Sequence, residues 1–209
     1  MYLSRVKLDT DLRSTKSALA NPQQMHAIVA GCFDGAEERQ RPIWRIDTLQ
    51  QATYLLVASA ASPDFANLIT QLTSNGEIEV IIKDYDGFLS SIKDGDGLRF
   101  RLCANPVHSV KQECGQSDRG KLFGHITVGH QKSWLEQRSL KSGFELSTFD
   151  VVSRGERRFR RGDQTVTLTV ATYEGLLTVS DADLLRQTLT SGIGRAKAYG
   201  CGLMTVARL

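Results

Sequence analysis

The chain has 209 residues and a mass of 23.1 kDa, enough for one domain or two small ones. Its hydrophobic share of 41% and charged share of 23% are near the averages of globular proteins. No apolar run approaches the roughly 20 residues that span a bilayer, so we expect no membrane association. The net charge of only +3 favours no class of partner by itself.

The N-terminus and the cysteines argue against a secreted, a zinc-binding or a disulfide-rich protein. The opening MYLSRVKLDT lacks the apolar core of a signal peptide, so we expect a cytoplasmic protein. The four cysteines, at positions 32, 103, 114 and 201, are scattered and form no CxxC pair, which argues against a zinc site or a disulfide framework. We therefore expect no metal and no cofactor.

The first half of the chain alternates between strand and helix patterns. Residues 2–9 read as a strand, and a helix with Asn21 as N-cap and Pro22 in first position follows. Gln24 could complete a capping box there. Two short strands, a helix and a strand come next, at residues 43–48, 53–59, 62–72 and 98–104. The order is βαββαβ, which is typical of a ferredoxin-like domain.

The second half repeats this order without repeating the sequence. We expect a strand at residues 121–128, a helix that ends at Gly143, two long strands, a helix capped by Asp181 and a final strand. The fold class is therefore α+β, with two tandem ferredoxin-like domains and antiparallel sheets. The expected bounds are 1–107 for the N-terminal domain, 108–121 for a polar linker and 122–209 for the C-terminal domain.

The two long strands meet at a cluster of arginines, SRGERRFRRG, at residues 153–162. Five arginines stand there against one acid, and a focused patch on a nearly neutral protein indicates a polyanionic partner. The arginines are Arg154, Arg157, Arg158, Arg160 and Arg161. Alternation predicts that Arg99 and Arg101, on the outward face of the strand at 98–104, extend this basic surface. The alternative is a solvated edge that resists aggregation.

The C-terminal stretch SGIGRAKAYGCGLMTVARL contains four glycines and two cations from Gly192 to Gly202. One interpretation is structural, because glycines end a helix and loosen the entry to a strand. The other is that Gly192 and Gly194 let the backbone approach phosphates, with charge added by Arg195 and Lys197. It is not a dinucleotide-binding motif, since the strand and helix stand in the reverse order.

Five stretches follow one another along nearly the whole chain: MYLSRV, ANPQQMH, LRFRLCANP, EGLLTVSD and GIGRAKAYGCGLMTV. Together, and in this order, they resemble the CasE family, the CRISPR repeat-processing endoribonucleases of type I-E systems. The resemblance implies two ferredoxin-like domains that bind the repeat hairpin of a precursor RNA. It also implies one cut at the 3′ base of the stem without metal, a 2′,3′-cyclic phosphate product, and retention of the RNA as a subunit of the Cascade complex.

The resemblance places the family's catalytic histidine at His26. Attack of a 2′-hydroxyl on the adjacent phosphate needs one proton removed and another delivered, and an imidazole can do either. Some family members have a tyrosine where this chain has Gln23, which can support catalysis by hydrogen bonding but cannot transfer a proton. The second catalytic group and the role of His26 as base or acid therefore stay open, and a non-catalytic hairpin-binding scaffold subunit is the alternative function.

The remaining candidates for chemistry are weaker. His108, His125 and His130 have no metal-binding spacing and read as solvated or structural. Asp94 and Asp96 lack the later ligands of a calcium loop, so a tight turn is the better interpretation.

Overall fold

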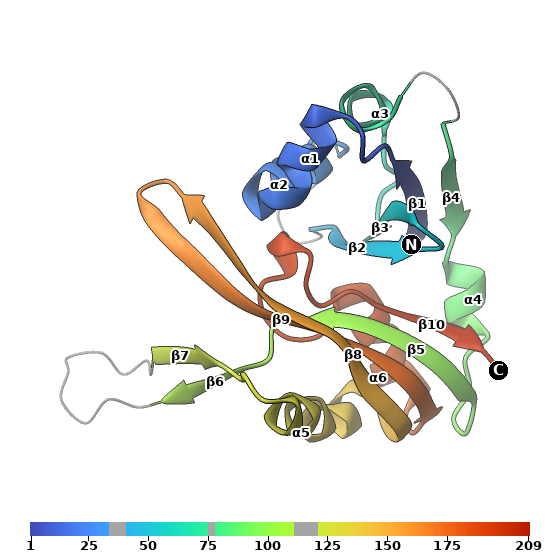
Figure 1. Ribbon diagram of the computed structural model, residues 1–209. Coiled ribbons are helices and arrows are strands. Elements are labelled where there is room, and N and C mark those ends of the chain that lie inside the picture. Colours follow the sequence, from blue (N-terminus) through green and yellow to red (C-terminus); the bar gives the residue numbers. More distant parts are fainter. Residues whose placement is uncertain (34–40, 75–77, 111–120) are drawn as a thin grey trace.

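The protein contains two antiparallel sheets of four strands each and a small sheet of two strands (Figure 1). This computed structural model describes residues 1–33, 41–74, 78–110 and 121–209. None of the helices in the described part of the chain combines the length and apolarity that a bilayer crossing requires.

The first sheet has the strand order β2-β3-β1-β4. Its elements are β1 (Tyr2–Leu8), α1 (Arg13–Ala20), α2 (Pro22–Ala30), β2 (Ile43–Leu49), β3 (Ala52–Ser59), α3 (Ala66–Leu72) and β4 (Val80–Asp84). The helices pack Met25, Val29 and Leu68 against Val6 and Leu55 of the sheet, and none of these residues is more than 1% exposed. This is the ferredoxin-like arrangement.

The second sheet has the equivalent order, β10-β5-β9-β8. Its elements are β5 (Gly97–Ala104), α5 (Val128–Ser139), β8 (Phe144–Arg161), β9 (Gln164–Val179), α6 (Ala182–Ser191) and β10 (Met204–Arg208). The short helix α4 (Asp86–Ser90) precedes it, and the 3₁₀ turns η2 (Leu140–Ser142) and η3 (Lys197–Tyr199) follow α5 and α6. Leu135, Leu185 and Leu189 pack on Phe100 and Tyr173 as a second core. The expected tandem ferredoxin-like fold is confirmed.

One predicted strand lies in the other sheet. The strand at residues 98–104 was expected to complete the N-terminal sheet, but it is β5, which pairs with β9 and β10. The fourth strand of the first sheet is instead β4, which pairs with β1. Alternation of apolar and polar residues shows that one face of a strand is buried. It does not show which sheet the strand joins. We propose a domain boundary between β4 and β5 in place of residue 107.

The predicted linker is only partly described. Its ends belong to the hairpin of β6 (Val107–Val110) and β7 (Lys121–Gly124), and residues 111–120 lie outside the described residues. The strand predicted at 121–128 is therefore β7, which pairs with β6 and not with the second large sheet.

The helix ends follow the predicted caps closely. The Asn21 side chain accepts a hydrogen bond from the Gln23 amide at 3.1 Å, and Asp181 accepts one from the Leu184 amide at 2.9 Å. Gly143 has φ of 82°, the left-handed conformation expected after α5. The expected capping box is wrong, because the Gln24 side chain accepts a hydrogen bond from Ser17 of α1 instead.

A buried arginine joins the two domains. Arg45 of β2 is 1% exposed, and its guanidinium binds both carboxylate oxygens of Asp47 at 2.8 and 2.7 Å. The same group donates to the carbonyl oxygens of Arg101 and Leu203 and to the hydroxyl of Thr205, all in the C-terminal domain. These five bonds use all five N–H donors of the side chain.

We expect Asp47→Ala to lower the free energy of unfolding by about 3–5 kcal/mol, because it leaves the Arg45 guanidinium buried without its carboxylate. The measurement is the urea midpoint followed by circular dichroism. Asp86→Ala is the control, since Asp86 pairs with the N-terminal ammonium but its side chain is 66% exposed, so the midpoint should hardly move. Equal shifts for both variants would contradict a special role for the buried pair.

Candidate active site

His26 lies in the middle of α2, at the interface between the domains. Helix α2 begins at Pro22, so His26 follows Gln23 by nearly one turn and both side chains face the same way. Both contact Tyr199 of η3: its hydroxyl donates to Gln23 Oε1 at 3.3 Å, and its ring meets the imidazole edge to face at 6.2 Å between centroids. His26 is half-buried, so the imidazole is also open to a ligand.

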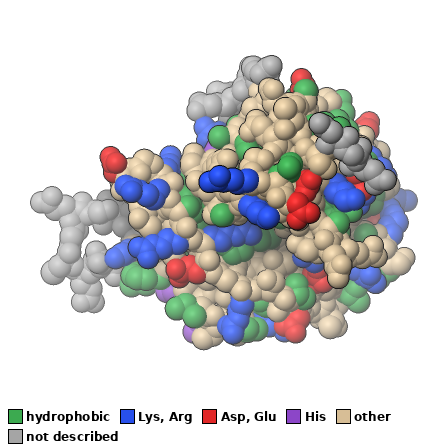
Figure 2. Space-filling model, turned by 45° about the horizontal axis from the view of Figure 1, so that its top comes forward, with side chains coloured by type: hydrophobic (Ala, Val, Ile, Leu, Met, Phe, Trp, Pro, Cys, Tyr) green, Lys and Arg blue, Asp and Glu red, His purple; other side chains and the backbone are tan. Residues whose placement is uncertain are grey.

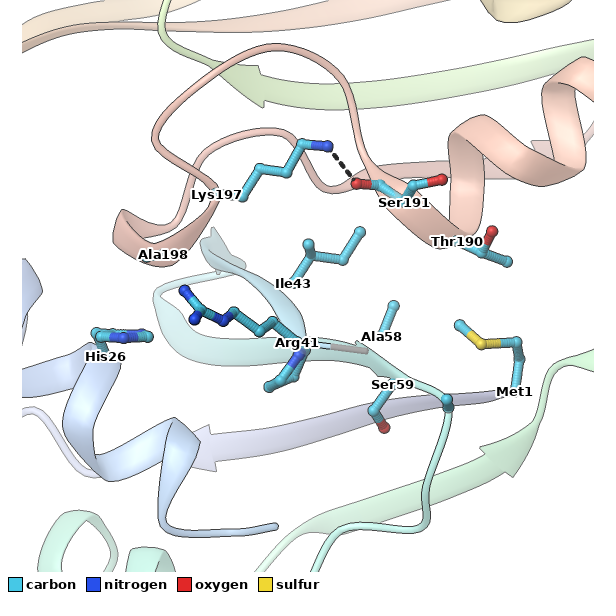
Figure 3. A pocket seen from close by; sticks show the side chains of 12 residues that line it. Met1, His26, Arg41, Ile43, Ala58, Ser59, Thr190, Ser191, Lys197 and Ala198 are labelled. Carbon is cyan, nitrogen blue, oxygen red and sulfur yellow. Dashed lines mark hydrogen bonds between the residues drawn. The ribbon is translucent and has the colours of Figure 1, made fainter. Parts of the chain in front are cut away.

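A pocket of about 560 Å³ opens beside His26. Figure 3 shows the imidazole at one end of this pocket, with the Arg41 side chain beside it and Lys197 on the opposite wall. The walls come from both domains, because β2 and β3 provide Ile43 and Ser59, whereas the end of α6 and η3 provide the opposite side. The pocket is therefore a histidine-containing cleft with two cationic side chains.

The environment of His26 favours a neutral imidazole. Burial lowers its pKa below the ordinary 6.5, and the positive charges of Arg41 and Arg161 lower it further. An imidazole with a lowered pKa is unprotonated at neutral pH and can accept a proton. Burial also lowers the pKa of Lys197, whose ammonium donates to the Ser191 carbonyl oxygen at 2.6 Å at the end of α6.

The glycine-rich loop is packed closely against the first domain. Gly192 follows α6 with φ of 73°, and a Cβ there would lie 2.8 Å from the Gly202 carbonyl oxygen. Gly200 has φ of 77°, and its Cβ would lie 2.6 Å from the ring of Trp44 in β2. The left-handed conformation and the close approach both require glycine. These contacts support the structural interpretation of the motif, and an RNA contact by Gly192 stays a prediction.

The arginine cluster lies on a two-stranded arm, which we define as residues 154–170. Only residues 171–178 of β9 pair with β5, so β8 and β9 continue past the sheet to a turn at Gly162. On the inner side of the arm, Phe159 is 6% exposed and packs on Tyr199 at 4.7 Å between ring centroids. Arg157 also lies there and donates to the Tyr199 carbonyl oxygen at 3.5 Å.

The other arginines of the arm are exposed: Arg154, Arg158, Arg160 and Arg161. In Figure 2, Lys and Arg side chains gather from the projecting part on the left to the middle of the face. Because the charge of Arg161 acts on His26, the arm brings this part of the cluster close to the imidazole. The structure thus joins two features that are more than 120 residues apart, at positions 26 and 153–162.

Arg101 is already engaged inside the protein. Its guanidinium pairs with Asp47 at 3.1 Å and with Glu174, so it belongs to the ionic network around Arg45. Arg99 is exposed two residues earlier, on the same face of β5. An RNA contact by either residue stays a prediction, and for Arg101 it would compete with two carboxylates.

Gly194 and Arg195 line a different pocket, of about 270 Å³, which shares no residue with the His26 pocket. Two further histidines line it, and three histidine rings lie in a row, with centroid distances of 4.6 Å from His108 to His125 and 5.7 Å from His125 to His130. Burial lowers the pKa of His125, and the two neighbouring rings add to the effect. The sequence did not indicate this cluster.

Two residues at the His26 site could not be recognised from the sequence. Arg41 lies just before β2, in the stretch RPIW, where no local motif marks it as a residue of the site. Tyr199 lies within the glycine-rich motif, but its contact with Gln23 joins positions 176 residues apart. Only the packing of the two domains reveals either one.

The fold and the site together define a tandem ferredoxin-like protein with a histidine in a cationic cleft and an arginine-rich arm beside it. The chain belongs to the CRISPR-associated protein family, whose model matches residues 1–208. The resemblance to the CasE family found in the sequence is thereby confirmed.

The chain is similar to several known members of this family. It is 29% identical to the CRISPR-associated endoribonuclease Cse3 of Thermus thermophilus, across 99% of this chain and 100% of that protein. It is 31% identical to the Cascade subunit CasE of Escherichia coli, across 55% of this chain and 60% of that protein. A structure of Thermus thermophilus Cse3 with an RNA that represents a pre-cleavage complex has a TM-score of 0.81 and 28% identity, and covers 99% of this chain and 98% of its own.

We expect the His26 imidazole to titrate below the ordinary histidine pKa in the free protein, because burial and two nearby cations disfavour its charged form. The measurement is an NMR titration of the His26 ring protons. Arg161→Ala should raise this pKa toward the ordinary value, whereas Arg154→Ala should leave it unchanged, since Arg154 contacts the Ile126 carbonyl oxygen away from the cleft. A normal titration in the wild-type protein would contradict the lowered pKa of His26.

Proposed function

We propose that this protein is a metal-independent endoribonuclease that binds the hairpin of a CRISPR repeat in precursor RNA and cuts once at the 3′ base of the stem. It then keeps the processed RNA as a subunit of a Cascade complex, in the cytoplasm. The observation that carries the proposal is the placement of His26 in one cleft with Arg41 and Lys197, next to the arginine-rich arm. The names of the relatives, an endoribonuclease and a Cascade subunit, support it.

His26 acts as the general base in this proposal. The neutral imidazole takes the proton of the ribose 2′-hydroxyl, the 2′-oxygen forms a bond to the adjacent phosphorus, and the bond from phosphorus to the 5′-oxygen breaks. The leaving 5′-oxygen takes up a proton from water, the imidazolium returns its proton to water, and a 2′,3′-cyclic phosphate remains. Positioned proton transfer of this kind contributes about 10² to 10⁴ in rate.

The cationic side chains of the cleft stabilise charge during this step. Negative charge accumulates on the phosphate oxygens as the 2′-oxygen attacks, and fixed positive groups in a half-buried site stabilise it better than water does. Arg41 and Lys197 line the cleft on either side of the space next to His26. Gln23 lies on the same face of α2 and can donate its amide N–H to a phosphate oxygen.

The arm holds the stem of the hairpin. Arg158 and Arg160 alternate with buried Phe159 on β8, so both point away from the body of the protein. A-form RNA hides its base edges in a deep, narrow groove, so contacts with the stem are made mainly to phosphates and to its shape. A clamped stem places the scissile bond in the cleft, and such positioning adds to the rate.

We expect cleavage of a labelled repeat hairpin by wild-type protein in EDTA, and a loss of about 10² to 10⁴ in the single-turnover rate for His26→Ala. The measurement separates substrate and product on a denaturing gel, and affinity is measured with a hairpin that carries a 2′-deoxy substitution at the cut site. His26→Ala should bind this analogue as tightly as the wild-type protein does.

His130→Ala, at an exposed histidine of the other pocket region, is the matched control and should cut normally. Cleavage that stops in EDTA would refute metal independence, and normal cleavage by His26→Ala would remove this residue from the mechanism. Tight binding without any cleavage by the wild-type protein would establish the scaffold function instead.

We expect the double variant Arg158→Ala, Arg160→Ala to bind the hairpin more weakly and with a smaller salt dependence. Each lost phosphate contact lowers the slope of log K against log salt concentration by about 0.7 to 0.9. The measurement is the hairpin affinity at several salt concentrations. Lys83→Ala with Lys141→Ala removes the same charge at exposed positions of β4 and η2 and should keep the slope. An unchanged slope for the arginine variant would place the stem elsewhere.

A further inference from the structure

Tyr199 is the residue through which the two domains and the arm meet at the active site. Its backbone is held in η3 by a hydrogen bond to the Ala196 carbonyl oxygen at 2.9 Å, and both flanking positions, Ala196 and Gly200, have positive φ. The arm contacts it through Phe159 and Arg157. The ring is therefore fixed from the C-terminal domain, although its functional contacts are with α2 of the N-terminal domain.

The side chain contacts both residues of α2 that face the cleft. The hydroxyl donates to Gln23 Oε1 at 3.3 Å, and the ring lies at 71° to the His26 imidazole. A carboxamide has one acceptor oxygen and one donor nitrogen, so holding the oxygen leaves the nitrogen to donate elsewhere. The ring contact at the same time restricts rotation of the imidazole.

We propose that Tyr199 is a positioning residue of the cleavage reaction, which orients the Gln23 carboxamide through its hydroxyl and the His26 imidazole through its ring. This inference rests on the proposed function and adds a residue from the second domain to the active site. In this role Tyr199 acts through Gln23 and His26, the two residues that its side chain contacts on α2. Arg41, Arg161 and Lys197 supply the charges around the imidazole.

Tyr199→Phe tests the hydroxyl alone, because it keeps the ring and its packing against Phe159. We expect the single-turnover rate to fall about 2- to 10-fold, as for the loss of one hydrogen bond, while affinity for the 2′-deoxy hairpin is unchanged. The effect should vanish in a Gln23→Ala background, since the hydroxyl acts through that residue. Tyr54→Phe, at a half-buried tyrosine of β3 that packs on Arg5, is the matched control and should keep the full rate.

Tyr199→Leu tests the ring. We expect a rate loss of about 10- to 100-fold from a misplaced imidazole. In an NMR titration the pKa of His26 should rise toward its ordinary value, because removal of the ring exposes the imidazole to water. Tyr199→Phe should keep the wild-type pKa of His26. A general loss of structure in this variant would change that pKa.

The outcomes separate this inference from the proposed function. Wild-type cleavage that depends on His26, together with an unchanged rate for Tyr199→Phe and an unchanged His26 titration for Tyr199→Leu, would overturn the role of Tyr199 alone. Additive effects of Gln23→Ala and Tyr199→Phe would overturn the action of the hydroxyl through Gln23. A wild-type protein that does not cut would overturn the proposed function, and this inference with it.

Discussion

The bonds of Arg45 across the domain interface are the constraint on which the site depends. Each ferredoxin-like unit has its own sheet and its own core, and a further apolar cluster of Ile43, Ala58 and Leu203 lies between them. Their relative position is set by contacts between β2 on one side and β5 and β10 on the other. The Asp47 carboxylate lies on the same strand as Arg45, so a shift of one domain against the other would break the bonds from the guanidinium to Arg101, Leu203 and Thr205 and leave buried N–H donors without partners.

The glycine-rich loop continues this constraint from the interface to the candidate active site. The Gly202 amide donates to the Cys103 carbonyl oxygen at 2.6 Å, which ties the loop to β5. Gly200 lies against Trp44, which precedes Arg45 on β2. The loop and the Arg45 side chain therefore both connect β2 to the C-terminal domain. His26 and Tyr199 then meet as a consequence. A histidine on one domain becomes part of a site because a loop from the other domain comes to it.

Local features of the sequence predicted local structure well. The caps at Asn21 and Asp181 follow from short-range rules, and the structure has them. The assignment of β5 was wrong because a half-buried strand does not specify its partner strands. The burial of Arg45 could not be predicted either, because an arginine within a strand is expected to be exposed unless its partners are known. Of the site, the family resemblance indicated His26, and only the tertiary structure brought Arg41 and Tyr199 to it.

The alternation of side chains along the arm links the architecture to the function. In β8, successive side chains point to opposite sides, so Phe159 and Arg157 face the protein while Arg158 and Arg160 face away. The inner residues hold the arm against Tyr199, and the outer ones remain available to phosphates. The strand that carries the outer arginines packs directly on Tyr199, which contacts His26. The surface proposed to bind the stem and the residues proposed to perform the chemistry therefore belong to one packed unit.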